Sequence, residues 1–181
     1  MVLFQLANAS TLPLVNGMLA QEGKAQAALV AALIIVPQLI VALLAPWVGQ
    51  RAEKRGRKAL LLVGFAAPPI RAVLFALVSN RLALIIIQVL DGITGAVIGV
   101  MTALVIADLA KGTGRFNLAQ GMFGTLMGVG ASLSPTLSGL IVHHFGYWSG
   151  FVSLAGEGIV AVVVLALFLP ETKEDLHPGG D

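Results

Sequence analysis

The chain has 181 residues, of which 57% are hydrophobic and only 11% are charged, and its formal net charge is +2. A soluble domain has about 45 to 50% apolar and roughly 25% charged residues, so this composition argues against a soluble protein and indicates an integral membrane protein. The absence of cysteine excludes disulfides, thiolate metal sites and cysteine nucleophiles.

Apolar runs separated by short polar segments predict six transmembrane helices. One span needs about 20 apolar residues, so six fit this chain length with tight connections. The expected fold class is all-α, a polytopic membrane protein with a six-helix domain at 1–170 and a polar cytoplasmic tail at 171–181. The predicted spans lie near residues 3–20, 27–48, 58–78, 82–106, 117–140 and 147–169.

The first predicted span carries a polar face. Its polar residues are Gln5, Asn8, Thr11 and Asn16. At about 100° per residue they fall within an arc of roughly 140°. An amide without a partner in hydrocarbon costs several kcal/mol, so this face is expected to line either a water-filled cavity or a polar helix interface. Gln38 and Gln88, in the second and fourth spans, are further candidates for a substrate path, although a single buried amide can also bond a neighbouring helix.

The basic residues predict how the chain is oriented in the membrane. Because successive helices alternate in direction, the second loop, the fourth loop and the tail share one side. The Lys and Arg residues on that side are Arg51, Lys54, Arg55, Arg57, Lys58, Lys111, Arg115 and Lys173, whereas the other side has only Lys24 and Arg81. The positive-inside rule therefore places the first group and both termini in the cytoplasm, as expected for a multi-pass protein of a bacterial inner membrane.

Three ionisable side chains fall inside predicted spans. A charge at membrane depth is expensive, so Arg71, Asp91 and Glu157 are each candidates for a functional role. At about 1.5 Å per residue, Arg71 lies roughly 10 Å and Asp91 roughly 13 Å below the outer ends of two neighbouring antiparallel spans, so they can meet. A structural ion pair and a substrate or proton role both remain open. Glu157 has no evident cationic partner and is a candidate proton site, unless it faces water.

Enzymatic and metal chemistry have no basis in the sequence. His143 and His144 are adjacent in a helix, so their side chains point about 100° apart and cannot easily share one metal ion. No nucleophile, metal cluster or phosphate-binding loop has the required spacing. We therefore expect no catalytic residue, no metal and no cofactor. The basic residues lie in short loops rather than along one face, so nucleic acid is not an expected partner.

The second loop carries the most specific motif. It reads G-Q-R-A-E-K-R-G-R-K and closely resembles the G-x-x-A-D-R-x-G-R-K signature of the major facilitator superfamily. In that family the motif joins the second and third helices of a six-helix half on the cytoplasmic side, where the charge distribution independently places this loop. The resemblance implies a gating loop whose charges form switchable pairs with neighbouring helix ends. Its residues are Gly49, Glu53, Lys54, Gly56, Arg57 and Lys58, with Asp108 and Arg115 of the fourth loop as expected partners.

Two further features of the sequence are similar to this family. The fifth span resembles the antiporter motif G-x-x-x-G-P-x-x-G-G, with serine in place of two glycines. Its matching residues are Gly130, Ser134, Pro135, Ser138 and Gly139. In the fourth span, Gln88 stands where an N-terminal half usually carries the arginine of R-x-x-x-G. This departure points to a C-terminal half.

The resemblance implies one half of a major facilitator fold, acting in proton-coupled efflux of a small solute. The first and fourth spans would line the substrate path. The expected partners are the lipid bilayer, a small-molecule substrate and a complementary six-helix half or second copy. The alternative is a truncated or non-transporting six-span membrane module that assembles with a partner.

Overall fold

The structure, a computed structural model, describes residues 1–55 and 57–169, without the side chains of 53–55 and 109. Within these residues all regular structure is helical, as predicted. The helices are α1 (Val2–Ala9), α2 (Thr11–Gln21), α3 (Ala27–Arg55), α4 (Lys58–Leu77), α5 (Arg81–Ile87), α6 (Val89–Ala110) and α7 (Phe116–Phe168). Gly56 and the predicted tail at 171–181 lie outside the described residues.

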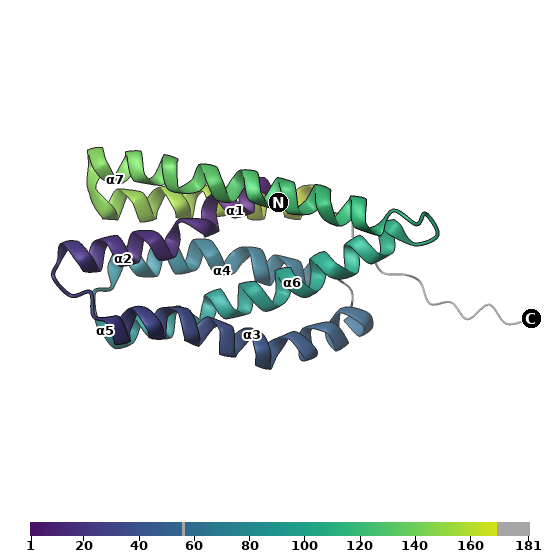
Figure 1. Ribbon diagram of the computed structural model, residues 1–181, viewed down its shortest axis with the longest axis horizontal. Helices are drawn as coiled ribbons and strands as arrows, with labels where there is room; N and C mark the ends of the chain where they lie inside the picture. Colours follow the sequence, from purple (N-terminus) through teal and green to yellow (C-terminus); the bar gives the residue numbers. More distant parts are fainter. Residues whose placement is uncertain (56, 170–181) are drawn as a thin grey trace, which may run out of the picture.

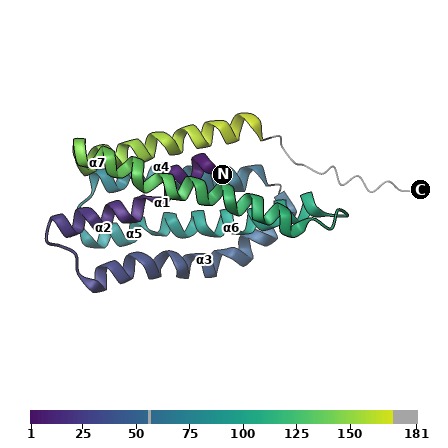
Figure 2. The same ribbon diagram turned by 45° about the horizontal axis from the view of Figure 1, so that its top comes forward.

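The helices form one elongated bundle with their axes roughly along its length (Figures 1 and 2). Five segments are long and apolar enough to cross a membrane, namely 2–21, 27–52, 58–77, 81–108 and 116–168. The last segment, α7, consists of two helices that meet at Gly146, whose φ of 82° and ψ of 171° are not helical. Because glycine tolerates a positive φ, the chain can reverse there. Its two limbs, residues 116–145 and 147–168, run back along each other (Figure 1).

Two predicted spans are broken helices. The first is interrupted at Ser10, between α1 and α2, and the fourth is interrupted at Gln88, between α5 and α6. A run of apolar residues predicts the length of a membrane-crossing segment. It does not predict such a break, because the residues on both sides of it are apolar. Both views also place the N-terminus part-way along the bundle rather than at an end (Figures 1 and 2).

The predicted second loop is shorter than expected. We expected a loop from Gly49 to Lys58, but α3 continues to Arg55 and α4 begins at Lys58. Gln, Ala, Glu, Lys and Arg dominate residues 50–55 and are good helix formers. The fall in hydropathy at residue 49 therefore marks where the apolar part of the helix ends and not where the helix itself ends.

Prolines in α3 and α4 free backbone carbonyls that α6 and the α5–α6 junction satisfy. Proline has no N–H, so Pro37 and Pro68 cannot donate to the carbonyls of Leu33 and Gly64, four residues earlier. The side-chain Nε2 of Gln88 donates to the Leu33 carbonyl at 2.6 Å. The hydroxyl of Thr94 donates to the Gly64 carbonyl at 3.3 Å. These bonds fix α3 and α4 to the fourth span at the points where their own hydrogen bonding is interrupted.

The two ends of the bundle are closed by polar contacts. At one end Arg81 Nη1 donates to Gln26 Oε1 at 3.2 Å, which joins the first and third loops. At the other end Arg57 forms an ion pair with Asp108, which joins the start of α4 to the end of α6. Between these ends the interior contains two apolar clusters, one around Leu33, Phe75 and Phe151 and the other around Phe4, Phe65 and Met101.

Candidate substrate cavity and charge pair

A polar cavity of about 420 Å³ lies between α1, α3, α6 and the first limb of α7. Its polar lining residues are Gln5, Asn8, Gln38, Asp91, Thr94 and Thr102. The five amide residues predicted for a substrate path are Gln5, Asn8, Asn16, Gln38 and Gln88. Three of them, Gln5, Asn8 and Gln38, meet at this one cavity. Amide, hydroxyl and carboxylate groups around a single space can bind a polar solute and water.

The other two predicted path residues lie elsewhere. Gln88 is buried, and its side chain contacts Leu33 and Arg71 instead of lining the cavity. Its position at the α5–α6 break explains this, because the amide is used to satisfy the carbonyl that Pro37 frees. Asn16 lies in α2 on the far side of the Ser10 break, and its Oδ1 atom is buried without a hydrogen-bond partner among the described residues.

Arg71 of α4 and Asp91 of α6 form an ion pair, and its aspartate is part of the cavity wall. The arginine side chain is 2% exposed and the aspartate side chain 27% exposed. Arg71 Nη2 also donates to Asn8 Oδ1 at 2.8 Å, and Nη1 donates to Gln88 Oε1 at 3.4 Å. A buried guanidinium is tolerated only with such compensation. The network therefore connects the first, third and fourth spans.

The pair is asymmetric with respect to the cavity. Asp91 lines the cavity, whereas Arg71 lies behind it and is screened from its contents. A proton or a cationic group in the cavity thus reaches the carboxylate and not the guanidinium. Protonation of Asp91 would remove the counter-charge of Arg71 and change the bonding of Asn8 and Gln88. This geometry can convert proton binding into a rearrangement between helices.

Glu157 lies apart from this network. It is half-buried in the second limb of α7, and no ion pair to it exists among the described residues. The neighbouring Gly158 packs on Pro69 of α4, where an added Cβ would lie 2.9 Å from the proline ring. The structure does not bring Glu157 to the cavity of Asp91, and its proton role stays a prediction.

The predicted gating motif lies partly in helices. Gly49 is inside α3 and Lys58 is the first residue of α4. Arg57 pairs with Asp108, one of the two expected fourth-loop partners. The other, Arg115, is exposed next to the start of α7, and its backbone N–H donates to Thr113 Oγ1 at 3.2 Å. Of the remaining motif positions, the side chains of Glu53 and Lys54 and all of Gly56 lie outside the described part of the chain.

The antiporter-like motif divides between two faces of the first limb of α7. Gly130, Ser134 and Ser138 are buried, the first two against the first span, whereas Pro135 and Gly139 are exposed. A Cβ at Gly130 would lie 2.5 Å from the carbonyl oxygen of Val2, so only glycine allows this approach. One face of the motif thus packs against α1 and Ser10, and the other face is exposed.

Ser134 stabilises the break in the first span. The break at Ser10 leaves the Leu6 carbonyl without its regular helical donor, and Ser134 Oγ donates to this carbonyl at 2.6 Å. The hydroxyls of Ser10 and Ser134 are also 2.6 Å apart and hydrogen-bonded. A glycine at position 134, as in the family motif, would have no hydroxyl for either contact.

We therefore expect Ser134→Ala to lower the free energy of unfolding by about 1 to 2 kcal/mol, because it leaves a buried carbonyl unsatisfied. The measurement is unfolding by sodium dodecyl sulfate in mixed micelles. The matched control is Ser132→Ala, which removes an exposed hydroxyl bonded at 3.0 Å to Val129 in its own helix. Equal effects of the two substitutions would contradict the role of Ser134 at the break.

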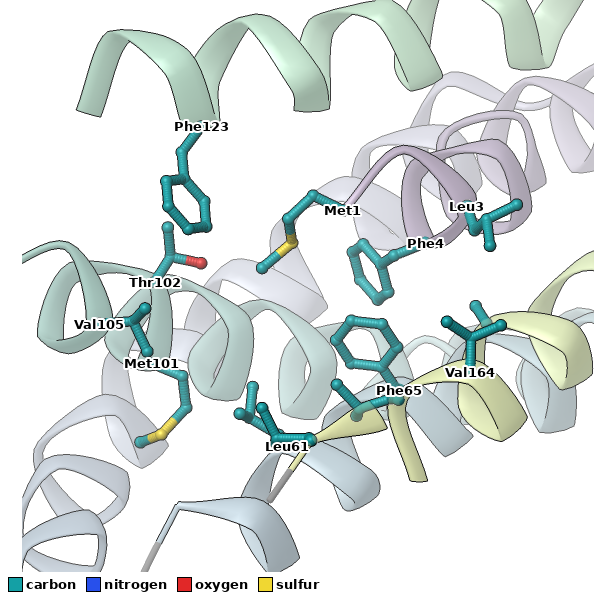
Figure 3. Close-up of a pocket in the computed structure, with 13 residues that line it drawn as sticks. Met1, Leu3, Phe4, Leu61, Phe65, Met101, Thr102, Val105, Phe123 and Val164 are labelled. Carbon is teal, nitrogen blue, oxygen red and sulfur yellow. The ribbon is translucent and has the colours of Figure 1, made fainter. Parts of the chain in front are cut away.

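A second, apolar cavity of about 250 Å³ lies beside the polar one. Figure 3 shows the residues that line the apolar cavity. Phenylalanines from three helices line it, namely Phe4 of α1, Phe65 of α4 and Phe123 of α7. The rings of Phe4 and Phe65 are 4.8 Å apart between centroids and tilted by 45°. Phe4 and Thr102 line both cavities, so the two spaces share a boundary there.

Sequence reasoning missed four residues of this region, and for different reasons. Thr94 could have been found, because it is a polar residue at membrane depth and Pro68 implies a free carbonyl nearby. Ser10 and Thr102 gave no signal, since hydroxyl residues occur throughout membrane helices. Phe4 could not be distinguished from an ordinary apolar residue facing lipid.

The sequence matches the Major Facilitator Superfamily over residues 1–180. The chain belongs to this family. An uncharacterized MFS-type transporter of Mycobacterium tuberculosis is 38% identical over 174 residues. A multidrug transporter protein of Bacillus subtilis is 31% identical over 122 residues, or 67% of this chain and 22% of that protein. A tetracenomycin C resistance and export protein of Streptomyces glaucescens is 25% identical over 130 residues, or 72% of this chain and 24% of that protein.

These matches confirm the predicted family. The relatives are bacterial, which supports a multi-pass protein of a bacterial membrane. The match to the M. tuberculosis protein covers 96% of this chain but only 42% of that protein. The chain thus spans less than half the length of the relatives it matches.

Proposed function

We propose that the chain is the C-terminal six-helix half of a major facilitator transporter that moves a small solute across the membrane by proton-coupled efflux. The observation that carries the proposal is the polar cavity inside an otherwise apolar bundle, with the carboxylate of Asp91 on its wall and a buried cation behind it. A solute would bind at Gln5, Asn8 and Gln38. Asp91 would carry the proton, with Glu157 as a second candidate.

Six membrane crossings are the simplest arrangement for the described helices. Of the five long apolar segments, α7 has 53 residues, or about 80 Å of helix at 1.5 Å per residue, against a hydrocarbon thickness of about 30 Å. Its reversal at Gly146 divides it into two spans. By the positive-inside rule we propose that the end of the bundle with Arg57 and Asp108 faces the cytoplasm and that the chain begins and ends toward this side, with its N-terminus part-way along the bundle.

Support for a complementary half comes from the two flanks of the polar cavity. Of the membrane-crossing segments, those of α3 and α7 are the least buried. The cavity lies between them, with Gln38 of α3 exposed beside it and Met127 of α7 on its opposite side. The exposed face of the first α7 limb also carries polar groups, including Thr125, Ser132 and Thr136. The amide of Gln38 would be better satisfied against another protein surface than against lipid, and small hydroxyl residues are common at contacts between membrane helices.

The motifs favour the C-terminal half and an export direction. Gln88 takes the place of the arginine of an N-terminal half, and the structure uses it to hold Leu33 and Arg71. The fifth span carries the antiporter-like motif. The name of the S. glaucescens relative, a resistance and export protein, is consistent with efflux as the direction.

The proposal is tested by flux into proteoliposomes. The purified chain is reconstituted alone, at less than one copy per vesicle and at high density, and together with the part of the M. tuberculosis relative that the match does not cover. Uptake of radiolabelled tetracenomycin C and of a mixed panel of aromatic drugs is then measured with and without an imposed pH gradient. We expect flux only with the second half or at high density, and only with the gradient.

Each other result has a defined meaning. Gradient-driven flux from single copies would contradict the half-transporter assignment. Absence of flux in every combination, with folded protein and intact vesicles, would contradict transport and favour the alternative of a non-transporting membrane module that assembles with a partner. Flux that ignores the pH gradient would contradict proton coupling alone.

A further inference from the structure

We infer that the apolar cavity is a binding site for a ring-sized apolar group of the solute whose polar end occupies the neighbouring polar cavity. The ligand class is an amphiphile with a hydrogen-bond-donating head, such as an ammonium or amide group, and a compact aromatic or alicyclic tail. This inference deepens the proposed function. It rests on that proposal only where it calls the ligand a transported solute. The binding site itself does not depend on transport.

The size and lining of the apolar cavity fit the ring-sized apolar group of the ligand. An apolar cavity of roughly 150 Å³ in a protein is large enough to bind benzene. The cavity here is about 250 Å³, and nearly all of its lining is apolar. Phenylalanine rings converge on it from α1, α4 and α7, and Met1 and Met101 add flexible side chains (Figure 3). Tilted rings and thioethers can adapt to an aromatic guest.

The shared boundary supports a ligand that occupies both cavities. Phe4 and Thr102 line the apolar and the polar cavity alike. The hydroxyl oxygen of Thr102 is buried and has no hydrogen-bond partner within the described part of the chain. Such an orphan group is costly unless something bonds it. A ligand passing from one cavity to the other would place a polar atom next to this hydroxyl.

The charges around the polar cavity indicate which polar group of the ligand fits there. Asp91 faces the polar cavity as a hydrogen-bond acceptor, while Arg71 is screened behind it. The amide side chains of Gln5, Asn8 and Gln38 can accept as well as donate. A head group that donates hydrogen bonds is therefore favoured over an anion, and the apolar tail then lies toward Phe65 and Phe123.

The test compares two ammonium ligands that differ only in the ring. Butylammonium and 4-phenylbutylammonium are titrated into the purified chain in dodecyl maltoside, and affinities are obtained from calorimetry. Burial of the phenyl group is expected to make binding of the second ligand roughly 10- to 100-fold tighter. Equal affinities, or no binding of either ligand, would overturn the inference.

Two neighbouring valines provide matched variants. Val164 lines the apolar cavity, whereas Val163 does not, and both are partly exposed. We expect Val164→Phe to fill the cavity and remove most of the preference for the phenyl ligand, and Val163→Phe to keep it. Ala161→Leu fills the same cavity from a buried position and is expected to act like Val164→Phe. Retention of the preference in both cavity variants would overturn the inference, because the tail would then lie elsewhere or in detergent.

The outcomes separate this inference from the proposed function. Phenyl-dependent binding that the cavity variants abolish, in a protein without flux, would leave the site standing and refute transport. Flux without any phenyl preference would refute the site alone. A tightly bound phospholipid that phenylbutylammonium does not displace would also refute the site, since an acyl chain would then fill the cavity.

Discussion

Asp91→Asn is expected to abolish gradient-driven flux and to lower the free energy of unfolding by about 3 kcal/mol, because it leaves the charge of Arg71 buried without a counter-ion. We place the stability effect at the lower end for a broken buried pair, since Asp91 is partly exposed to the cavity. Stability is measured by sodium dodecyl sulfate titration in mixed micelles. Flux is measured in proteoliposomes with the complementary half present.

A double variant separates the structural role of Asp91 from its role in proton transfer. In Arg71→Gln with Asp91→Asn, no charge is buried, so most of the lost stability is expected to return. Gradient-driven flux is not expected to return, because no protonatable group faces the cavity. Recovery of both would show that the pair is structural only. Glu157→Gln is the stability control, because it removes a carboxylate that has no ion pair in the described structure. It is expected to change the free energy of unfolding by less than about 1 kcal/mol.

Gly92→Val is expected to lower the free energy of unfolding by about 3 kcal/mol and to impair flux. Gly92 of α6 is buried against α3, where an added Cβ would overlap Ile40 and lie 2.8 Å from the carbonyl oxygen of Pro37. A backbone carbonyl cannot move aside as a side chain can, so α3 must shift as a whole. The shift would also disturb the cavity, since Pro37 and Gln38 line it.

Gly99 provides the matched control in the same helix. A Cβ at Gly99 would meet nothing within 4 Å, so Gly99→Val is expected to leave the free energy of unfolding within about 0.5 kcal/mol of the original value. Both proteins would be compared by the same detergent titration. Similar losses of stability for the two variants would mean that helix propensity, and not the contact between α3 and α6, determines the outcome.

Much of the architecture follows from the sequence, because hydrocarbon imposes simple requirements. Long apolar runs separated by polar segments predicted the helical membrane fold, and the second-loop motif predicted the family. The depth of Arg71 and Asp91 placed them within reach of each other, and the structure contains their ion pair. The arc of polar residues in the first span put Gln5 and Asn8 on one side, and both line the polar cavity.

Other features depend on contacts between segments that are distant in the chain. The break at Ser10 is stabilised by Ser134, which is 124 residues away in sequence. Gln88 bonds the Leu33 carbonyl because Pro37, in another helix, leaves that carbonyl free. From its own position in the sequence, Gln88 was instead predicted to line the cavity. The sequence did not reveal that α3 continues to Arg55, because a charged helix end and a charged loop have similar amino-acid compositions. The apolar cavity depends on how phenylalanines from three helices converge, which no single segment reveals.

The hydrogen bonds that Gln88 and Thr94 make to the proline-interrupted helices have a mechanical consequence. They tie α3 and α4 to the fourth span by bonds whose loss would expose unsatisfied carbonyls to hydrocarbon. The first span contacts α7 at Gly130 and Ser134, and it is joined to α4 by the bond from Arg71 to Asn8. An opening of the polar cavity that keeps α3, α4 and α6 together as one stiff body and moves the first span would therefore have to break the bond between Arg71 and Asn8.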